Sequence, residues 1–174
     1  MYREICEFIK ELYPNKKPVM LHSPVFLGNE KKYLEECIDT TFVSYVGKYV
    51  TEFEEMTAKY TGAKYAVAVV NGTAALQIAL QTAGVEYDDE VITQPLTFVA
   101  TANAISHVGA QPIFVDVDKD TKGMSPEKLE EWLKNNTKYD KTKKKTTNKA
   151  TKKTISAIVP VHTFGFTCRI KDLI

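Results

Sequence analysis

The sequence predicts an α/β fold built on a mostly parallel sheet that begins near residue 63. Residues 65–70 (YAVAVV) are small or β-branched without polar alternation, which is typical of a strand buried on both faces. From there, short apolar strands alternate with segments of helical spacing, the pattern of a parallel sheet covered by helices. Residues 1–62 show helical spacing only. We therefore expect a helical layer packed outside the sheet, followed by an α/β domain over residues 63–174.

The composition is that of a globular protein without a disulfide scaffold. Of the 174 residues, 44% are hydrophobic, which is enough for one sizeable core. The three cysteines (Cys6, Cys37 and Cys168) form no CxxC pair, which suits a reducing compartment. No apolar run approaches the ~18 residues of a membrane span, and the amphipathic amino terminus is unlike a signal peptide. We expect a cytoplasmic protein with no membrane partner.

Three helices are predicted before the sheet. Residues 2–12 form the first, and an extended stretch over residues 18–27 follows it. Gly28 and Asn29 open the second helix, a loop occupies residues 41–47, and Gly62 ends the third helix. The inward side chains of the second and third helices are expected to be Tyr33, Leu34, Cys37, Ile38, Val50, Phe53, Met56 and Tyr60.

The turn after residues 65–70 is the first candidate binding site. Asn71 or Thr73 can cap the helix over residues 74–83, and Gly72 permits a backbone turn closed to other residues. This helix is apolar nearly all round, so we expect it inside the protein. Unpaired N–H groups at its start, with the helix dipole behind them, form a natural phosphate site. A tight turn that binds nothing is the alternative, because neither GxGxxG nor a P-loop is present.

The remaining elements alternate as the fold requires. Strands are predicted at 90–94, 112–117 and 155–161, and a helix at 97–108. Ser125 caps a further helix with Pro126 in its first turn. The carboxyl ends of these strands share one edge of the sheet, where ligands bind in such folds. We therefore expect residues 71–73, 94–98, 116–118 and 162–165 to lie at that edge.

Two charged segments are expected to have no site of their own. Asp116, Asp118, Asp120 and Glu127 have the spacing of a calcium loop, but Thr121 stands where that loop requires glycine, so we expect no metal. Residues 134–153 hold nine lysines and one aspartate, a net charge of +8 in a chain of net charge +1. This insert is expected to be a flexible, solvated loop. Tyr139 is the single aromatic residue among these lysines, which is too few to stack successive bases, so we do not expect the insert to bind nucleic acid.

Three ordered motifs, NGTAALQIAL, DDEVITQPLTFVATANAISHVGAQPIFVDVD and IVPVHTFG, resemble the DegT/DnrJ/EryC1/StrS family of sugar aminotransferases. The resemblance runs from about Met20 to the last residue. It implies a pyridoxal 5′-phosphate (PLP) enzyme with the large domain of fold type I, here incomplete. The lysine-rich insert resembles the branch that aminates UDP-sugars for legionaminic-type nonulosonic acids.

The resemblance also assigns roles to residues. Gly72, Thr73 and Ala74 match the segment that holds the cofactor phosphate. Phe98 matches the aromatic residue that stacks on the pyridine ring, although its helical spacing also allows a core position. His162 contacts the edge of the cofactor or satisfies a backbone group. In the loop over residues 41–47, Ser44 is the expected substrate contact.

In this family the cofactor site is completed later in the chain, by an aspartate on the next strand and by the lysine that binds PLP covalently. The resemblance therefore implies that residues 1–174 are the amino-terminal part of an aminotransferase and are inactive alone. The complete enzyme would be a homodimer that moves an amino group from an amino acid, expected to be glutamate, to a nucleotide-linked keto-sugar. The strand at 65–70 would lack its neighbour. The alternative is a non-catalytic α/β module that binds phosphate or regulates another protein.

Overall fold

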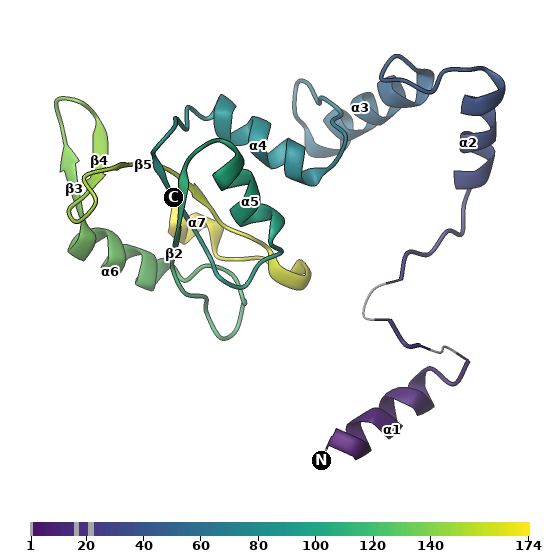
Figure 1. Cartoon of the computed structure of the whole chain (residues 1–174), viewed down its shortest axis with the longest axis horizontal. Coiled ribbons are helices and arrows are strands. Elements are labelled where there is room, and N and C mark those ends of the chain that lie inside the picture. The colour runs from purple at the N-terminus through teal and green to yellow at the C-terminus, as the bar shows by residue number, and fades with distance from the viewer. Residues whose placement is uncertain (1, 16–17, 21–22) are drawn as a thin grey trace. The chain divides into compact units, whose positions relative to one another are not determined.

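The computed structural model describes residues 2–15, 18–20 and 23–174 (Figure 1). The chain divides into two units, residues 1–66 and residues 67–174. Each unit is described by itself. Residues 21 and 22 of the predicted extended stretch lie outside the described residues.

The first unit contains three helices, α1 (Tyr2–Leu12), α2 (Glu30–Asp39) and α3 (Lys48–Thr61). Gly62 has a φ of 74° directly after α3, so it ends the helix in the left-handed conformation predicted for it. No residue of the three helices is buried. Leu34 on α2 is 64% exposed and Met56 on α3 is 71% exposed. Within this unit these side chains are therefore exposed, and their predicted packing in a layer outside the sheet stays a prediction.

The second unit is built on a five-stranded sheet of order β2-β1-β5-β4-β3. The strands β1 (Glu90–Thr93), β2 (Gln111–Phe114) and β5 (Thr154–Val159) are parallel. They are the three strands predicted at 90–94, 112–117 and 155–161. Antiparallel strands β4 (Lys145–Asn148) and β3 (Thr137–Asp140) extend the sheet beyond β5.

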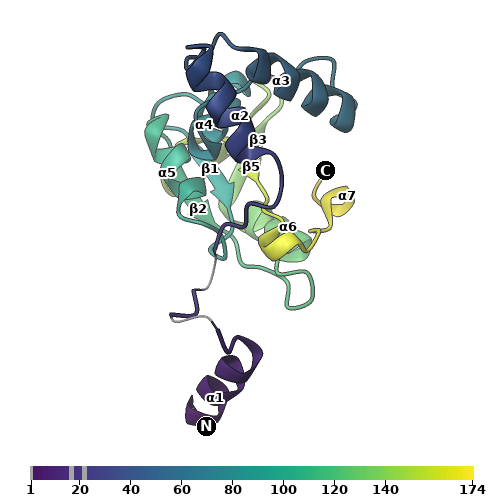
Figure 2. The same cartoon turned by 90° about the vertical axis from the view of Figure 1, so that its right-hand side faces the viewer.

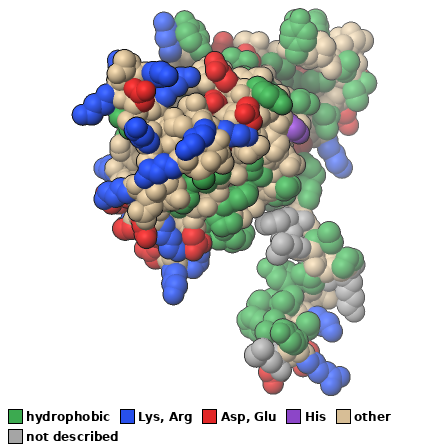
Figure 3. Space-filling model, turned by 60° about the vertical axis from the view of Figure 1, so that its left-hand side comes forward, with side chains coloured by type: hydrophobic (Ala, Val, Ile, Leu, Met, Phe, Trp, Pro, Cys, Tyr) green, Lys and Arg blue, Asp and Glu red, His purple; other side chains and the backbone are tan. Residues whose placement is uncertain are grey.

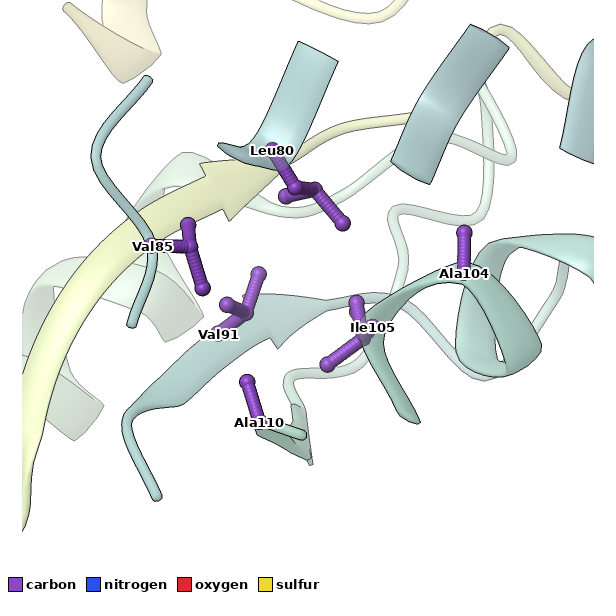
Figure 4. Close-up of a cluster of buried hydrophobic side chains, with 6 residues drawn as sticks. All are labelled: Leu80, Val85, Val91, Ala104, Ile105 and Ala110. Atoms are coloured by element: carbon purple, nitrogen blue, oxygen red, sulfur yellow. The ribbon is translucent and has the colours of Figure 1, made fainter. Parts of the chain in front are cut away.

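Helices cover both faces of the parallel strands (Figure 2). Val91 and Ile92 are adjacent on β1 and lie in different core clusters, because successive side chains of a strand point to opposite faces. The Val91 cluster contains Leu80 of α4 (Gly72–Thr82) and Ile105 of α5 (Ala100–His107) (Figure 4). The Ile92 cluster contains Leu129 of α6 (Pro126–Asn136), and Leu173 of α7 (Ile170–Leu173) packs against it. The parallel strands therefore lie between two helical layers.

The strand predicted at residues 65–70 is absent. This segment is extended but belongs to no ladder, and Tyr65, Val67 and Val70 are 76%, 81% and 89% exposed. A strand forms only where a neighbouring strand pairs with it along its length, and residues 65–70 belong to none of the paired strands of the sheet. The predicted burial of α4 is also largely wrong, because only Leu80 of that helix is buried.

The lysine-rich insert contains a pair of strands where a loop was predicted, and its flexibility stays a prediction. Strands β3 and β4 pair from Thr137↔Asn148 to Asp140↔Lys145 and form a hairpin. At its turn, Asp140 Oδ1 accepts hydrogen bonds from the backbone N–H groups of Thr142 (2.9 Å) and Lys143 (3.1 Å). The threonine and tyrosine residues that alternate with the lysines favour strands. The overall composition of the insert does not show this alternation, so it led to the prediction of a loop. Among the described helices, none is both long and apolar enough to cross a bilayer.

Candidate functional site

The turn before α4 presents backbone donors to solvent. Asn71 Oδ1 accepts a hydrogen bond from Ala74 N at 2.9 Å, so Asn71 is the helix cap, as predicted. The N–H groups of Gly72 and Thr73 have no protein acceptor among the described residues. Ala74 lies in the first turn of α4 as predicted, but its N–H already donates to Asn71 and is not available to a ligand. The site therefore offers two backbone donors at the positive end of an 11-residue helix.

Gly72 is part of α4, and its φ is not in the left-handed region. The expectation that only glycine fits this turn conformation is therefore wrong. A Cβ built on Gly72 would meet no heavy atom within 4 Å, so space is open beside the backbone. Free N–H groups beside open space, with the Thr73 hydroxyl next to them, fit a phosphate that approaches the main chain. These donors suit the phosphate of PLP.

Phe98 lies in the loop between β1 and α5, where its side chain is 78% exposed. The helix begins at Ala100 and not at residue 97, so Phe98 precedes it. A core position for this ring is therefore ruled out in this chain. Helices α4 and α5 cover the same face of the sheet, because Leu80 and Ile105 share one cluster (Figure 4). The helix that starts at Gly72 and the helix that follows the loop of Phe98 thus lie on the same face of the sheet.

The side chain of Gln94 joins the loops at the carboxyl edge of the sheet through hydrogen bonds, a role that its sequence context does not predict. Its side chain follows β1 directly and is fully buried. Its Oε1 accepts from Met124 N at 2.8 Å and from Val161 N at 3.0 Å. Its Nε2 lies within hydrogen-bond distance of the oxygens Leu96 O (2.9 Å), Lys122 O (3.2 Å) and Thr163 Oγ1 (2.9 Å). One amide thus connects the loops that carry Phe98 and His162.

His162 satisfies a backbone group, which was one of its two predicted roles. Its Nδ1 accepts a hydrogen bond from Cys168 N at 3.1 Å. The Cys168 Sγ also lies 3.1 Å from Nδ1. Burial raises the pKa of the Cys168 thiol, which keeps this sulfur uncharged beside the ring. The imidazole therefore holds the segment after β5 in place.

Ion pairs engage three of the four acidic residues that have calcium-loop spacing, Asp116, Asp118 and Glu127. Asp116 pairs with Lys128 Nζ at 2.5 Å, and this hydrogen bond lowers the pKa of Asp116. Arg169 pairs with Asp118 and Glu127, each at 2.7 Å, and lowers the pKa of Glu127. In the part of the chain that the structure describes, no three His, Cys, Asp or Glu residues form a possible metal site.

Ser44 lies in the first unit, so the structure does not test its relation to the Gly72 turn. Its Oγ accepts from Val46 N at 3.4 Å. It lines a cavity of about 500 Å³ formed by α2, the 40–47 loop and the start of α3. Tyr49 OH donates to Glu36 Oε2 at 2.5 Å beside this cavity, which lowers the pKa of Glu36 and raises that of Tyr49.

Known proteins resemble this chain in both sequence and structure. The GDP-perosamine synthase of Escherichia coli O157:H7 is 37% identical over 158 residues, which cover 91% of this chain and 38% of that protein. The solved structure of DesI in the presence of its TDP-sugar product has a TM-score of 0.69 and 31% identity, and covers 91% of this chain and 36% of that one. NtdA of Bacillus subtilis with bound cofactor PMP has a TM-score of 0.59 and 25% identity, and covers 91% and 34%.

The chain thus spans less than two fifths of the length of these relatives. Residues 27–174 match the profile of one protein family. The matched range includes the turn at Gly72, the loop of Phe98 and the segment of His162. The fold and cofactor class expected from the three motifs agree with this match. The chain belongs to the DegT/DnrJ/EryC1/StrS aminotransferase family.

Proposed function

We propose that residues 1–174 supply the amino-terminal part of a PLP-dependent aminotransferase that acts on nucleotide-linked keto-sugars. The observation that carries this proposal is the start of α4, where the free N–H groups of Gly72 and Thr73 border open space in a member of this family. When bound, PLP supplies the electron sink that allows an amino group to move between two carbon skeletons.

The residues of this chain bind and orient the cofactor in the proposal. The N–H groups of Gly72 and Thr73 and the Thr73 hydroxyl donate to the phosphate, and Ala74 continues the turn that holds these donors. The α4 dipole favours the negative charge of the phosphate. Phe98 covers one face of the pyridine ring, because a flat aromatic side chain fixes a flat ring at little entropic cost. His162 positions the segment at the ring's edge through Cys168.

The substrates are assigned by class. A nucleotide-linked sugar is proposed as acceptor because the relatives include a GDP-perosamine synthase and a structure with a TDP-sugar product. Glutamate is proposed as the amino donor, and Ser44 as a contact to the sugar substrate. As the finer assignment, we propose a UDP-sugar on the way to legionaminic-type acids.

The complete protein is proposed to be a cytoplasmic homodimer. The lysine that binds PLP covalently is proposed to belong to a later part of the chain, as in this family. Residues 1–174 alone are then expected not to transaminate. Addition of PLP to this chain should produce only weak, non-covalent binding.

The experiment uses these residues together with the downstream reading frame, if that frame encodes an aspartate-containing strand and a Ser-x(4)-Lys-like segment. The purified protein receives ¹⁵N-glutamate and a panel of UDP-, dTDP- and GDP-keto-sugars, and mass spectrometry detects ¹⁵N in the sugar. We expect transfer to at least one sugar and a strong loss in Phe98→Ala. Failure to transfer ¹⁵N from glutamate to any of these sugars, or a frame without these segments, would favour the non-catalytic module.

A further inference from the structure

The β3–β4 hairpin lies at the end of the sheet opposite the candidate cofactor residues. Strand β4 pairs with the first residues of β5, Thr154 and Ile155. Asn148 Nδ2 donates to Glu90 Oε2 at 2.8 Å, and Glu90 is the first residue of β1. The hairpin is therefore anchored at the amino ends of the parallel strands. Phe98 and His162, in contrast, follow the carboxyl ends.

The hairpin encloses a concavity of about 520 Å³. This volume is within the range of about 300–1,000 Å³ found for small-molecule sites. The residues that carry its chemistry are four lysines and two hydroxyl side chains: Lys138, Lys141, Lys149, Lys152, Tyr139 and Thr147. Figure 3, in which the left-hand side of Figure 1 comes forward, shows Lys and Arg side chains gathered on the unit that contains the hairpin.

The lysines of the concavity lack carboxylate partners among the described residues. Lys149 Nζ donates to the carbonyl oxygens of Lys134 (3.2 Å) and Asn135 (2.9 Å), and Lys152 Nζ donates to Lys149 O (2.5 Å). By contrast, Lys134 pairs with Glu130, and Lys153 at the other end of the insert pairs with Asp88. The charge at the ends of the segment is neutralised, whereas the charge around the concavity is not.

The single carboxylate of the concavity does not cancel this charge. Asp140 Oδ1 is occupied by two backbone N–H groups of the turn, which lower the pKa of Asp140 and keep its one negative charge there. Four ammonium groups and one carboxylate leave a net charge of +3 around the lining. Ammonium and hydroxyl donors together suit phosphate oxygens, and lysine is a common phosphate ligand in proteins.

We propose that the hairpin concavity binds a diphosphate-bearing anion at a site separate from the one that would hold PLP. The diphosphate bridges Lys138 of β3, Lys141 of the hairpin turn, and Lys149 and Lys152 of the turn after β4. The hydroxyls of Tyr139 and Thr147 donate to its oxygens. The diphosphate of a nucleotide and inorganic pyrophosphate share this chemistry. The inference does not depend on the proposed aminotransferase activity.

The experiment compares two variants with the same change in charge. Lys138→Gln/Lys141→Gln removes two lysines that line the concavity. Lys143→Gln/Lys144→Gln removes two exposed lysines of the turn that do not line it. The ¹⁵N-labelled chain of residues 1–174 is titrated with pyrophosphate, UDP and uridine at 150 mM NaCl, and amide shifts over residues 137–153 give the affinity. Circular dichroism and the amide spectrum show that each variant is folded.

We expect pyrophosphate and UDP to shift these amides and uridine to leave them unchanged. The lining variant should weaken binding by about tenfold or more, because charge-assisted hydrogen bonds are lost, and the turn variant by roughly threefold or less. A stronger response to UDP than to pyrophosphate would identify a nucleotide as the ligand, and equal responses would identify pyrophosphate as sufficient.

Three results would overturn the proposal. Equal weakening in both variants would show a diffuse basic surface and no defined site. Binding of a single-stranded oligonucleotide without binding of pyrophosphate or UDP would make the hairpin a nucleic-acid surface. Absence of shifts over residues 137–153 with both diphosphates would also contradict it.

Discussion

Replacing Gln94 by alanine removes the side chain that holds three loops at the carboxyl edge of the sheet. The backbone N–H groups of Met124 and Val161 would lose their acceptor, Oε1. Each buried donor left unsatisfied costs about 1–3 kcal/mol, so we expect a loss of about 4 kcal/mol in the free energy of unfolding. At roughly 2–4 °C per kcal/mol for a chain of this size, Tm should fall by roughly 8–16 °C.

Urea unfolding followed by tryptophan fluorescence measures this effect. Trp132 is the single tryptophan of the sequence and packs against the cluster of Ile92 and Leu129, so its emission reports on the second unit. The matched control is Gln81→Ala, because Gln81 is exposed on α4. This control should change stability by no more than about 0.5 kcal/mol. A Gln94→Ala loss below about 1 kcal/mol, close to that of the control, would refute the reasoning.

Three further predictions concern packing, capping and charge. Leu80→Ala should destabilise the second unit by about 3 kcal/mol through a core cavity, whereas Ile78→Ala, at a side chain of the same helix that is 49% exposed, should have much less effect in the same urea assay. Asn71→Ala should cost about 1 kcal/mol and speed hydrogen exchange at the first turn of α4, and unchanged exchange would contradict the cap. Arg169 lowers the folded-state pKa of Glu127 below its ordinary 4.5, so this ion pair stabilises the fold above that pH and is lost as pH falls through the lowered value. The stability difference between wild type and Arg169→Met should therefore shrink from pH 7 to pH 3, and a constant difference would contradict the pairing.

Local signals were sufficient to predict the parallel strands and several helix ends. Strand β1 is a short apolar segment followed by Pro95. Its partners β2 and β5 are also short segments rich in apolar residues. Asn71 and Ser125 cap their helices through side-chain oxygens, at 2.9 Å and 3.4 Å from the N atoms of Ala74 and Lys128. Such signals depend on neighbours within four residues, which a single sequence provides.

The predictions that failed depend on partners far along the chain. Residues 65–70 have the composition of a buried strand, but a strand also requires a neighbour. The hairpin was concealed by lysines, although Thr137, Tyr139 and Thr146 have strand-forming side chains. The role of Gln94 rests on bonds to residues as distant as Thr163, 69 positions away, so composition and periodicity give no sign of it.

The most direct test of the cofactor site is the response of the Gly72 and Thr73 amides to pyridoxamine 5′-phosphate in a ¹⁵N spectrum of this chain. We expect both amides to shift with this ligand and to stay unchanged with pyridoxamine, which lacks the phosphate. Asn71→Ala should weaken the shifts, because it loosens the first turn of α4. Unchanged Gly72 and Thr73 amides at a saturating ligand concentration, or equal shifts with pyridoxamine, would contradict the assignment of this turn as the phosphate site.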